Sequence, residues 1–343
     1  ILGKNVAALE SEIAAYTGAK YAIGVASGTD AILIALMAAG VKAGDKVVTT
    51  PFTFFATAGS ISRIGAIPVF VDIDPETYNI DPTALEALLK KSSKGVKAVI
   101  PVHLYGQCAD MDPVMKIAKK YKLCVIEDAA QSIGAGYKGK RAGAIGHMGC
   151  LSFYPTKNLG CFGDGGMVTT NDAKLAERSK MLRVHGSRVR YYHDEVGANS
   201  RLDEIQAAIL RIKLKRLDSW ATGREKNAKK YDALFAKAAI KGVLSTPRIS
   251  EGSTSVYNQY VIRVKKRDEL RAYLAAEGIG SEVYYPLPLH MQKCFKGLGY
   301  KKGAFPVSEK AAKEVLALPI YPELTTAQIK HVVATIASFF EKA

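Results

Sequence analysis

Lys157 lies between an apolar run and a Gly-rich segment in the stretch 147–170, HMGCLSFYPTKNLGCFGDGGMVTT. This setting predicts a position at the floor of a pocket and not on a solvated helix face. Burial lowers the pKa of an ammonium group, which frees the amine to form a Schiff base with a carbonyl compound. The usual carbonyl cofactor is pyridoxal 5'-phosphate (PLP). The alternative is a surface lysine, the commonest environment for this residue type.

Three polar residues upstream favour the cofactor interpretation. Asp128 falls just past the predicted buried strand 123–126, at the carboxyl end where open α/β sheets place ligand groups. A carboxylate there can pair with a pyridinium nitrogen, and a protonated ring is the effective electron sink. Gln131 can reach O3' of the ring, and the Ser152 hydroxyl can bind the cofactor phosphate. Together with Lys157 these residues indicate a PLP site.

The sequence SGT at 27–29 is a second candidate phosphate-binding feature, at the start of a predicted helix 29–39. Gly28 lets the backbone approach an anion, and Thr29 is predicted to cap the helix while free N–H groups face the phosphate. On its own, this motif fits a plain helix cap better than a phosphate site. Its interpretation therefore depends on the distant lysine and carboxylate.

At this level of detail the chain resembles the DegT/DnrJ/EryC1/StrS family of PLP-dependent nucleotide-sugar aminotransferases over essentially its whole length. The resembling motifs are SGTDA at 27–31, PFTFFAT at 51–57, EDAAQ at 127–131, SFYPTKNLG at 152–160, GDGG at 163–166 and GANSRLDEIQAA at 197–208. The resemblance implies that Lys157 holds PLP through an imine and that Asp128 pairs with the ring nitrogen. It implies these further cofactor contacts: Phe54 on the ring face, Gly28, Thr29 and Ser152 at the phosphate, and Asn199 from a neighbouring subunit.

Strand and helix patterns alternate through the first two thirds of the chain, which predicts an α/β fold with a mostly parallel sheet. The resemblance implies the type I, aspartate-aminotransferase-like form of this fold. We expect a large PLP-binding domain at 1–235 and a small C-terminal α+β domain at 236–343, with a helix 204–236 bridging the two. In the small domain the pattern predicts helices at 267–277, 308–316 and 326–341.

Composition limits which other classes of protein this chain could belong to. The 343 residues are 48% hydrophobic, with no apolar run long enough to span a membrane and no signal peptide, so we expect a cytoplasmic globular protein. The five cysteines show no metal-ligand spacing, and no metal is expected. The net charge of +16 invites a nucleic-acid interpretation, but the lysines follow solvated helix faces and no binding motif accompanies them. The chain begins at Ile1, so we expect the family's N-terminal segment to be missing.

The loop 186–201 is long for a compact domain, and its Asn199 and Arg201 are predicted to reach a partner subunit in a homodimer with shared active sites. In the small domain Tyr284, Tyr285 and His290 are candidate substrate contacts, because Pro286 and Pro288 give the rim a defined shape. A rigid connector between domains is the equal alternative for that stretch.

The resemblance implies a ping-pong transamination from glutamate to a keto-sugar of a nucleotide diphosphate. The stretch 185–208 is most similar to enzymes that aminate C3 of UDP-2-acetamido-2-deoxy-3-keto-hexuronate for surface polysaccharides such as O-antigen. Arg201, Arg188 and Arg190 are candidate partners for the diphosphate and the carboxylate. Tyr284 stands where uronate-specific members are expected to carry His, which leaves a UDP- or dTDP-linked 3-keto or 4-keto-6-deoxyhexose as the alternative substrate.

Two other activities compete with transamination. A PLP-dependent dehydratase on the same scaffold is disfavoured, because such members typically replace the lysine that is present here as Lys157. A basic DNA-binding regulator without catalysis is the alternative from a different class.

Overall fold

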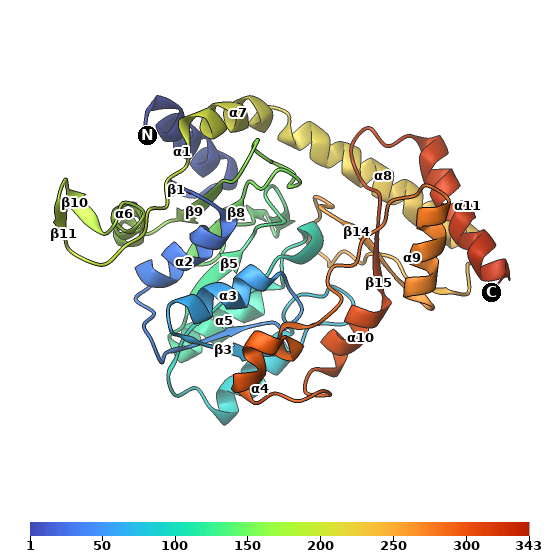
Figure 1. Cartoon of the computed structure of the whole chain (residues 1–343), viewed down its shortest axis with the longest axis horizontal. Helices are drawn as coiled ribbons and strands as arrows, with labels where there is room; N and C mark the ends of the chain where they lie inside the picture. The colour runs from blue at the N-terminus through green and yellow to red at the C-terminus, as the bar shows by residue number, and fades with distance from the viewer. Residues whose placement is uncertain (343) are drawn as a thin grey trace.

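The computed structural model describes residues 1–342, and Figure 1 shows their arrangement. The α-helices are α1 (Lys4–Thr17), α2 (Gly28–Ala38), α3 (Phe55–Arg63), α4 (Pro82–Lys91), α5 (Met111–Tyr121), α6 (Ala173–Leu182), α7 (Glu204–Leu214), α8 (Leu217–Ala238), α9 (Arg267–Ala276), α10 (Pro306–Glu314) and α11 (Thr326–Lys342).

Seven strands within the described residues form the central sheet, in the order β1-β9-β8-β5-β4-β2-β3. Their bounds are β1 (Tyr21–Val25), β2 (Lys46–Thr49), β3 (Ile67–Phe70), β4 (Val96–Val99), β5 (Cys124–Asp128), β8 (Met148–Ser152) and β9 (Gly166–Thr170). Strand β9 runs antiparallel to both of its neighbours, whereas the other neighbouring pairs are parallel. The predicted α/β class with a mostly parallel mixed sheet is confirmed.

Both faces of the sheet are covered by helices, which explains why its strands are apolar on both sides. In β5, Val125 packs into a cluster with α1, α4, α5 and α7, whereas the next residue, Ile126, packs into a second cluster with α2, α3 and α6. The same alternation separates Val48 from Val47 in β2, because successive side chains of a strand point to opposite faces. The sheet is thus the middle layer of three.

The C-terminal part of the chain builds a separate hydrophobic cluster around a small antiparallel sheet of β12 (Val243–Ser245), β14 (Tyr260–Val264) and β15 (Val315–Leu318). Helices α8, α9 and α11 pack on it, and Figure 1 shows them together at the right. Tyr231 and Phe235 of α8 belong to this cluster although they precede residue 236. The division into domains at 235/236 stays a prediction.

Two helix predictions in this region are wrong. The helix expected at 204–236 is two helices, with a break at Lys215 and Arg216 between α7 and α8. The helix expected at 308–316 ends at Glu314 as α10, and Val315 to Leu318 continue as strand β15. The second error has a physical cause, since a short apolar run can be buried in a helix or in a strand with the same local pattern.

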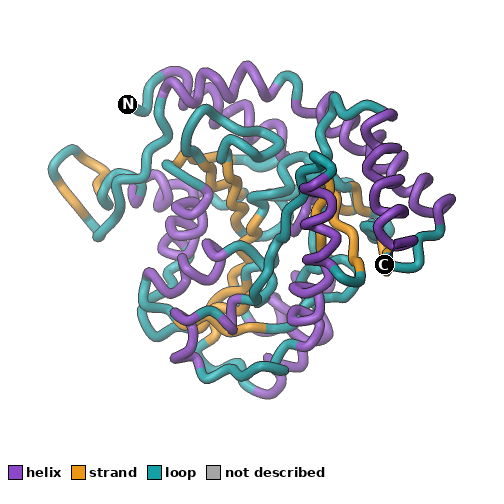
Figure 2. The backbone as a smooth tube through the Cα atoms, turned by 45° about the vertical axis from the view of Figure 1, so that its right-hand side comes forward, coloured by secondary structure: helices purple, strands orange, loops and turns teal. Residues whose placement is uncertain are grey.

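The loop at 186–201 contains a short hairpin of β10 (Ser187–Val189) and β11 (Tyr192–His193). Figures 1 and 2 show that it extends away from the body of the molecule. Several large apolar side chains there are exposed, among them Val189, Tyr191, Tyr192 and Val196. A third small sheet joins β13 (Ser253–Thr254) to β6 (Gly136–Tyr137) and β7 (Lys140–Arg141).

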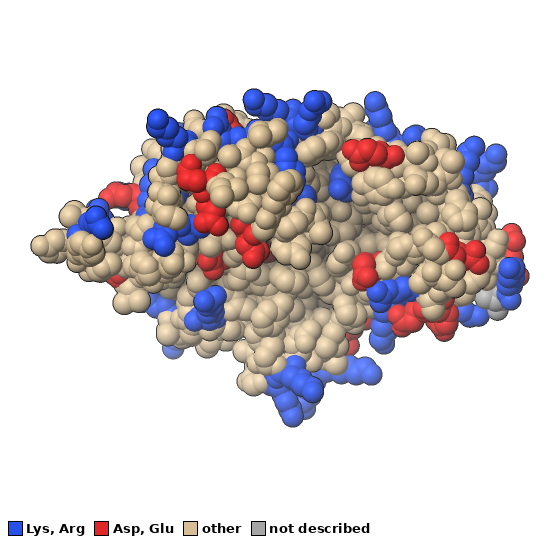
Figure 3. All heavy atoms as spheres, turned by 45° about the horizontal axis from the view of Figure 1, so that its top comes forward, with Lys and Arg blue, Asp and Glu red and all other residues tan. Residues whose placement is uncertain are grey.

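On the face drawn in Figure 3 the lysine and arginine side chains lie in separate groups with acidic side chains among them. Across residues 1–342, no helix combines the length and the apolar character that crossing a membrane requires. Within the same residues, no group of three His, Cys, Asp or Glu side chains has an arrangement that could hold a metal ion.

Candidate active site

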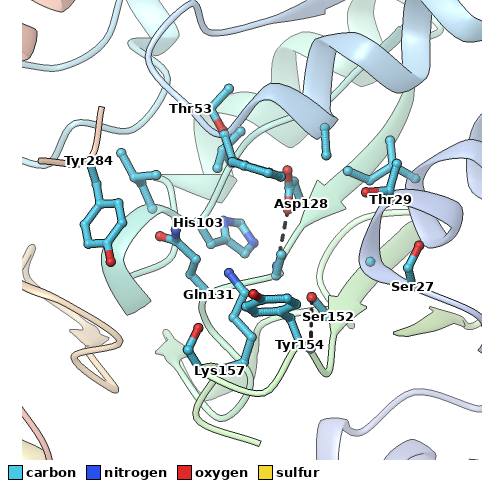
Figure 4. Close-up of a pocket in the computed structure, with 18 of the residues that line it drawn as sticks. Ser27, Thr29, Thr53, His103, Asp128, Gln131, Ser152, Tyr154, Lys157 and Tyr284 are labelled. Atoms are coloured by element: carbon cyan, nitrogen blue, oxygen red, sulfur yellow. Dashed lines mark hydrogen bonds between the residues drawn. The ribbon is translucent and has the colours of Figure 1, made fainter. Parts of the chain in front are cut away.

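A cavity of about 610 Å³ opens at the carboxyl ends of the parallel strands. Strands β1, β2, β4, β5 and β8 all point the same way, so the residues that end or follow them meet at one edge of the sheet. The lining residues from this edge are Ser27, Gly28, Thr29, Thr53, Phe54, His103, Asp128, Gln131, Ser152 and Lys157 (Figure 4).

Lys157 reaches the cavity from a tight loop that follows β8. Its backbone N–H donates to the Tyr154 carbonyl at 2.9 Å. A Cβ atom on Gly160 would lie 2.4 Å from the Pro155 carbonyl oxygen, so the loop closes only with glycine there. Burial lowers the pKa of the Lys157 ammonium, and the negative charge of Asp128 opposes that shift more weakly. The prediction that this lysine lies in a pocket is confirmed.

Asp128 is the last residue of β5 instead of following the strand, and its carboxylate lines the cavity. Thr57 Oγ1 donates to Oδ2 at 2.7 Å, and the Ala130 backbone N–H donates to Oδ1 at 3.2 Å. Its own backbone N–H is bonded to Pro101 and its carbonyl to His103. The carboxylate is therefore buried, hydrogen-bonded and fixed relative to the sheet.

Gly28 and Ser152 are packed directly against each other at the other end of the cavity. A Cβ atom on Gly28 would lie 2.5 Å from Cβ of Ser152, so only glycine allows helix α2 to begin this close to β8. The first amides of α2 have no partner within the helix, which makes its N-terminus favourable for an anion. The predicted cap is wrong in one detail: Ser27, not Thr29, is the N-cap, and its side chain accepts from the Asp30 N–H.

Gln131 is hydrogen-bonded to two tyrosines, one of which, Tyr285, lines the cavity. Its Oε1 accepts from the Tyr105 backbone N–H at 2.7 Å, and its Nε2 donates to the Tyr285 hydroxyl at 3.1 Å. The Tyr105 hydroxyl in turn donates to the Tyr284 carbonyl. Burial raises the pKa of the Tyr285 phenol far above its ordinary value, and the charge of Asp128 adds to this. The Tyr285 side chain, which enters the cavity from the C-terminal part of the chain, is thus a neutral phenol.

Phe54 and Tyr284 complete the rim. Phe54 is 57% exposed, and its ring centroid lies 6.1 Å from that of Tyr285. Tyr284 and Tyr285 both line the cavity, and their role as substrate contacts stays a prediction. The aromatic rings leave an open mouth at which a ligand can stack.

Three predicted site residues lie elsewhere. His290 does not line the cavity: it is buried in an aromatic cluster, where its Nε2 pairs with Glu309 Oε1 at 3.0 Å and its ring packs on Phe305. Its selection as a substrate contact is wrong, because the loop folds back on α10 there. Asn199 is exposed and Arg201 is half-buried, and neither belongs to the lining of this chain's cavity.

Arg188 was also a candidate partner for the substrate. It instead forms ion pairs with Glu177 of α6 and with Asp194 next to β11.

Sequence reasoning missed other residues of the cavity wall. Thr53 and Gln259 line the cavity, and Thr57 holds Asp128 from behind it. His103 is fully buried and bonded to Glu127 at 2.8 Å, and it also lines the cavity. The motif PFTFFAT contained the two threonines, but nothing in the sequence distinguishes a hydroxyl that contacts Asp128 from one buried in the core.

Comparison with protein families assigns residues 1–337 to the DegT/DnrJ/EryC1/StrS aminotransferase family. The chain belongs to this family. It is 56% identical to a pleiotropic regulatory protein of Geobacillus stearothermophilus over 99% of this chain and 90% of that protein. It is 47% identical to the UDP-2-acetamido-2-deoxy-3-oxo-D-glucuronate aminotransferase of Pseudomonas aeruginosa, over 98% of this chain and 91% of that enzyme.

Among solved structures, the fold matches that of DesV from Streptomyces venezuelae, crystallised in complex with a ketimine intermediate. The TM-score is 0.95 at 41% identity, over 100% of this chain and 91% of that one. The predicted aminotransferase fold is therefore confirmed. The chain is a PLP-dependent nucleotide-sugar aminotransferase, as the family and its close relatives are.

Independently of these comparisons, the residues of the cavity fit PLP. The cavity has an amine whose pKa is lowered by burial at one wall and a fixed carboxylate at another. At its end, a helix N-terminus and a hydroxyl lie against a glycine that leaves no room for a side chain. These features correspond to the aldehyde, the ring nitrogen and the phosphate of PLP.

Proposed function

We propose that this enzyme transfers an amino group from glutamate to C3 of UDP-2-acetamido-2-deoxy-3-keto-hexuronate, in the synthesis of a surface polysaccharide. The observation that carries the proposal is Lys157 in one cavity with Asp128, Gln131 and Ser152. The 47% identity to an aminotransferase named for the 3-oxo-glucuronate supports the choice of sugar. The runner-up is amination of a UDP- or dTDP-linked 3-keto or 4-keto-6-deoxyhexose.

We assign the cofactor contacts as follows. Lys157 Nζ would bind the cofactor aldehyde and Asp128 the ring nitrogen, and Gln131 would contact O3'. The N-terminus of α2 at Gly28 and Thr29, with the Ser152 hydroxyl, would hold the phosphate, and Phe54 would stack on the ring. When bound, PLP supplies an electron-withdrawing ring that stabilises negative charge on the carbon next to the transferred nitrogen.

The residues of this chain perform the proton transfers and exclude water. Because burial lowers the pKa of Lys157, its Nζ is more readily available as an uncharged base than an exposed lysine is. Lys157 Nζ would therefore accept the proton from the amino-bearing carbon of the donor and deliver it to the carbon on the other side of the transferred nitrogen. Asp128 supplies the fixed negative charge opposite the ring nitrogen, and the Tyr285 phenol closes the cavity from the C-terminal part.

We propose further that the working unit is a homodimer with shared active sites. Ile205 and Ile212 on the outward face of α7 are 74% and 71% exposed, and Phe162 nearby is 75% exposed. Neighbouring apolar side chains that form an exposed patch mark a surface suited to a partner. Asn199 and Arg201 lie on the segment between β11 and α7, and we assign them to the cofactor phosphate and the substrate of the second subunit.

The test is a two-stage reaction with the purified enzyme. PLP-loaded protein is mixed with L-glutamate, and conversion of the cofactor to its amine form is followed by its change in absorbance. The keto-uronate, made in situ by a dehydrogenase, is then added, and the amino sugar is identified by its mass. No change in the first stage removes glutamate as donor, and no amino sugar in the second removes the keto-uronate as acceptor.

A further inference from the structure

The carboxylate of Asp128 already has a hydrogen-bond donor on each oxygen. Thr57 Oγ1 donates to Oδ2 at 2.7 Å and the Ala130 N–H donates to Oδ1 at 3.2 Å. Thr57 is fully buried in the first turn of α3, and Asp128 is 5% exposed. A hydrogen bond to a charged group in such a site is short and strong, and it fixes the plane of the carboxylate.

The Thr53 hydroxyl lies next to the Thr57 hydroxyl, on the side away from Asp128 in the hydrogen-bond chain. Thr53 Oγ1 lies 3.0 Å from Thr57 Oγ1, and by this distance alone either hydroxyl could be the donor. A threonine hydroxyl has a single proton, and Thr57 gives it to the carboxylate. Thr53 must therefore donate to Thr57. The result is a directed chain from Thr53, which lines the cavity, through Thr57 to Asp128.

We propose that Thr57 is a positioning residue for the ring nitrogen of the cofactor, acting through Asp128. By occupying Oδ2 and holding the carboxylate plane, Thr57 leaves the free lone pairs of Asp128 for the ring nitrogen. Thr53 strengthens this contact because hydrogen bonds in a chain polarise one another. The inference rests on the proposed role of Asp128.

A purely structural role for Thr57 would predict a different pattern. Loss of a buried hydroxyl would then lower stability without changing the ring nitrogen. Thr49 provides the matched comparison, since its fully buried Oγ1 donates to the Ile100 carbonyl at 2.9 Å and it does not line the cavity. Thr49→Val removes the same group from the same domain, at a position whose hydroxyl bonds a backbone carbonyl instead of the Asp128 carboxylate.

The experiment measures the protonation of the ring nitrogen directly. Proteins carrying Thr57→Val, Thr57→Ser, Thr49→Val or Asp128→Asn are loaded with ring-labelled [15N]PLP, and the nitrogen signal is recorded by NMR. We expect the protonated signal in the wild type, its loss in Asp128→Asn and a shift toward that state in Thr57→Val. Thr57→Ser, which keeps the hydroxyl, and Thr49→Val should both give the wild-type signal. Thr57→Ala serves as the replacement should Thr57→Val not fold.

Steady-state kinetics supply the second readout. We expect Thr57→Val to lower kcat about tenfold with KM within about twofold, the size of one hydrogen bond to a charged group. Unfolding of the cofactor-free Thr57→Val and Thr49→Val proteins should shift by similar amounts. A wild-type nitrogen signal in Thr57→Val, together with a changed one in Asp128→Asn, would overturn this inference alone. An unchanged signal in Asp128→Asn would remove the proposed role of Asp128 and this inference with it.

Discussion

The Gln131 side chain donates through Nε2 to the Tyr285 hydroxyl at 3.1 Å, and this bond joins two parts of the chain that are 154 residues apart. Gln131 is held from its other end by the Tyr105 N–H. The C-terminal part therefore does more than cover the cavity. It completes the hydrogen bonds of a residue that we assign to O3' of the cofactor.

Tyr285→Phe tests that connection. The variant keeps the ring but leaves Gln131 Nε2 without its partner, so we expect kcat/KM to fall about threefold to tenfold, the range for one neutral hydrogen bond. Burial raises the pKa of the Tyr285 phenol far above its ordinary 10, so the hydroxyl stays protonated throughout an assay between pH 7 and 10. The pH profiles of the variant and the wild type should then have the same shape. An alkaline limb present in the wild type and missing in Tyr285→Phe would contradict this.

Lys157→Ala is expected to abolish transamination in a folded protein, because the lysine supplies both the covalent link and the proton transfer. Borohydride reduction of the PLP-loaded wild type should fix the ring on the peptide that contains Lys157, as identified by mass spectrometry. Lys174→Ala, a change of an exposed lysine at the start of α6, serves as the control and should be fully active. Turnover of the Lys157→Ala protein at a tenth of the normal rate, or a label on another lysine, would refute the assignment.

The residues at the strand ends were largely predictable, whereas the contacts between distant segments were not. Asp128, Ser152 and Gly28 each end or follow a buried strand, and parallel strands bring such positions to one edge whatever the rest of the chain does. His290 shows the limit of this reasoning. Its loop carries prolines and aromatic residues suited to a binding rim, but packing against Phe305 and Glu309 decides where the ring lies.

Thr57 shows the same limit, as a residue that nothing in the sequence gives a reason to select. A small polar residue in the first turn of a helix is ordinary, and only the tertiary structure brings its hydroxyl to Asp128 across 71 residues of sequence. Similarly, Val315 to Leu318 form a strand because β14 offers an open edge beside them. The local sequence pattern at 315–318 does not indicate that β14 will lie beside it.

Shared active sites predict that two inactive chains complement each other. We expect Lys157→Ala and Asn199→Asp proteins to be inactive separately and partly active as a hybrid, because one of its two sites then has both intact residues. Asn199→Asp would place a negative charge opposite the phosphate to which we assign Asn199, so we expect that protein to be inactive alone. Ile212→Asp, on the exposed face of α7, should convert the dimer to monomers in light scattering and reduce activity. A verified hybrid without activity would exclude shared sites.

The preference for a uronate is the last prediction, and it depends on charge. The proposed acceptor carries a carboxylate that a 6-deoxy sugar lacks, and an arginine can bind it in a two-pronged, charge-assisted contact. We assign that contact to Arg201 of the second subunit, because Tyr284 lines the cavity as a phenol and a phenol provides no positive charge. The 3-keto uronate should therefore exceed a 4-keto-6-deoxy sugar by at least about tenfold in kcat/KM, or about 1.4 kcal/mol.

Arg201→Lys should reduce this ratio, since lysine loses the planar fork, and it should slow the uronate more than the deoxy sugar. The assay compares both keto-sugars side by side with glutamate as donor. A faster reaction with the deoxy sugar, or an equal loss on both in Arg201→Lys, would favour the keto-deoxyhexose as substrate.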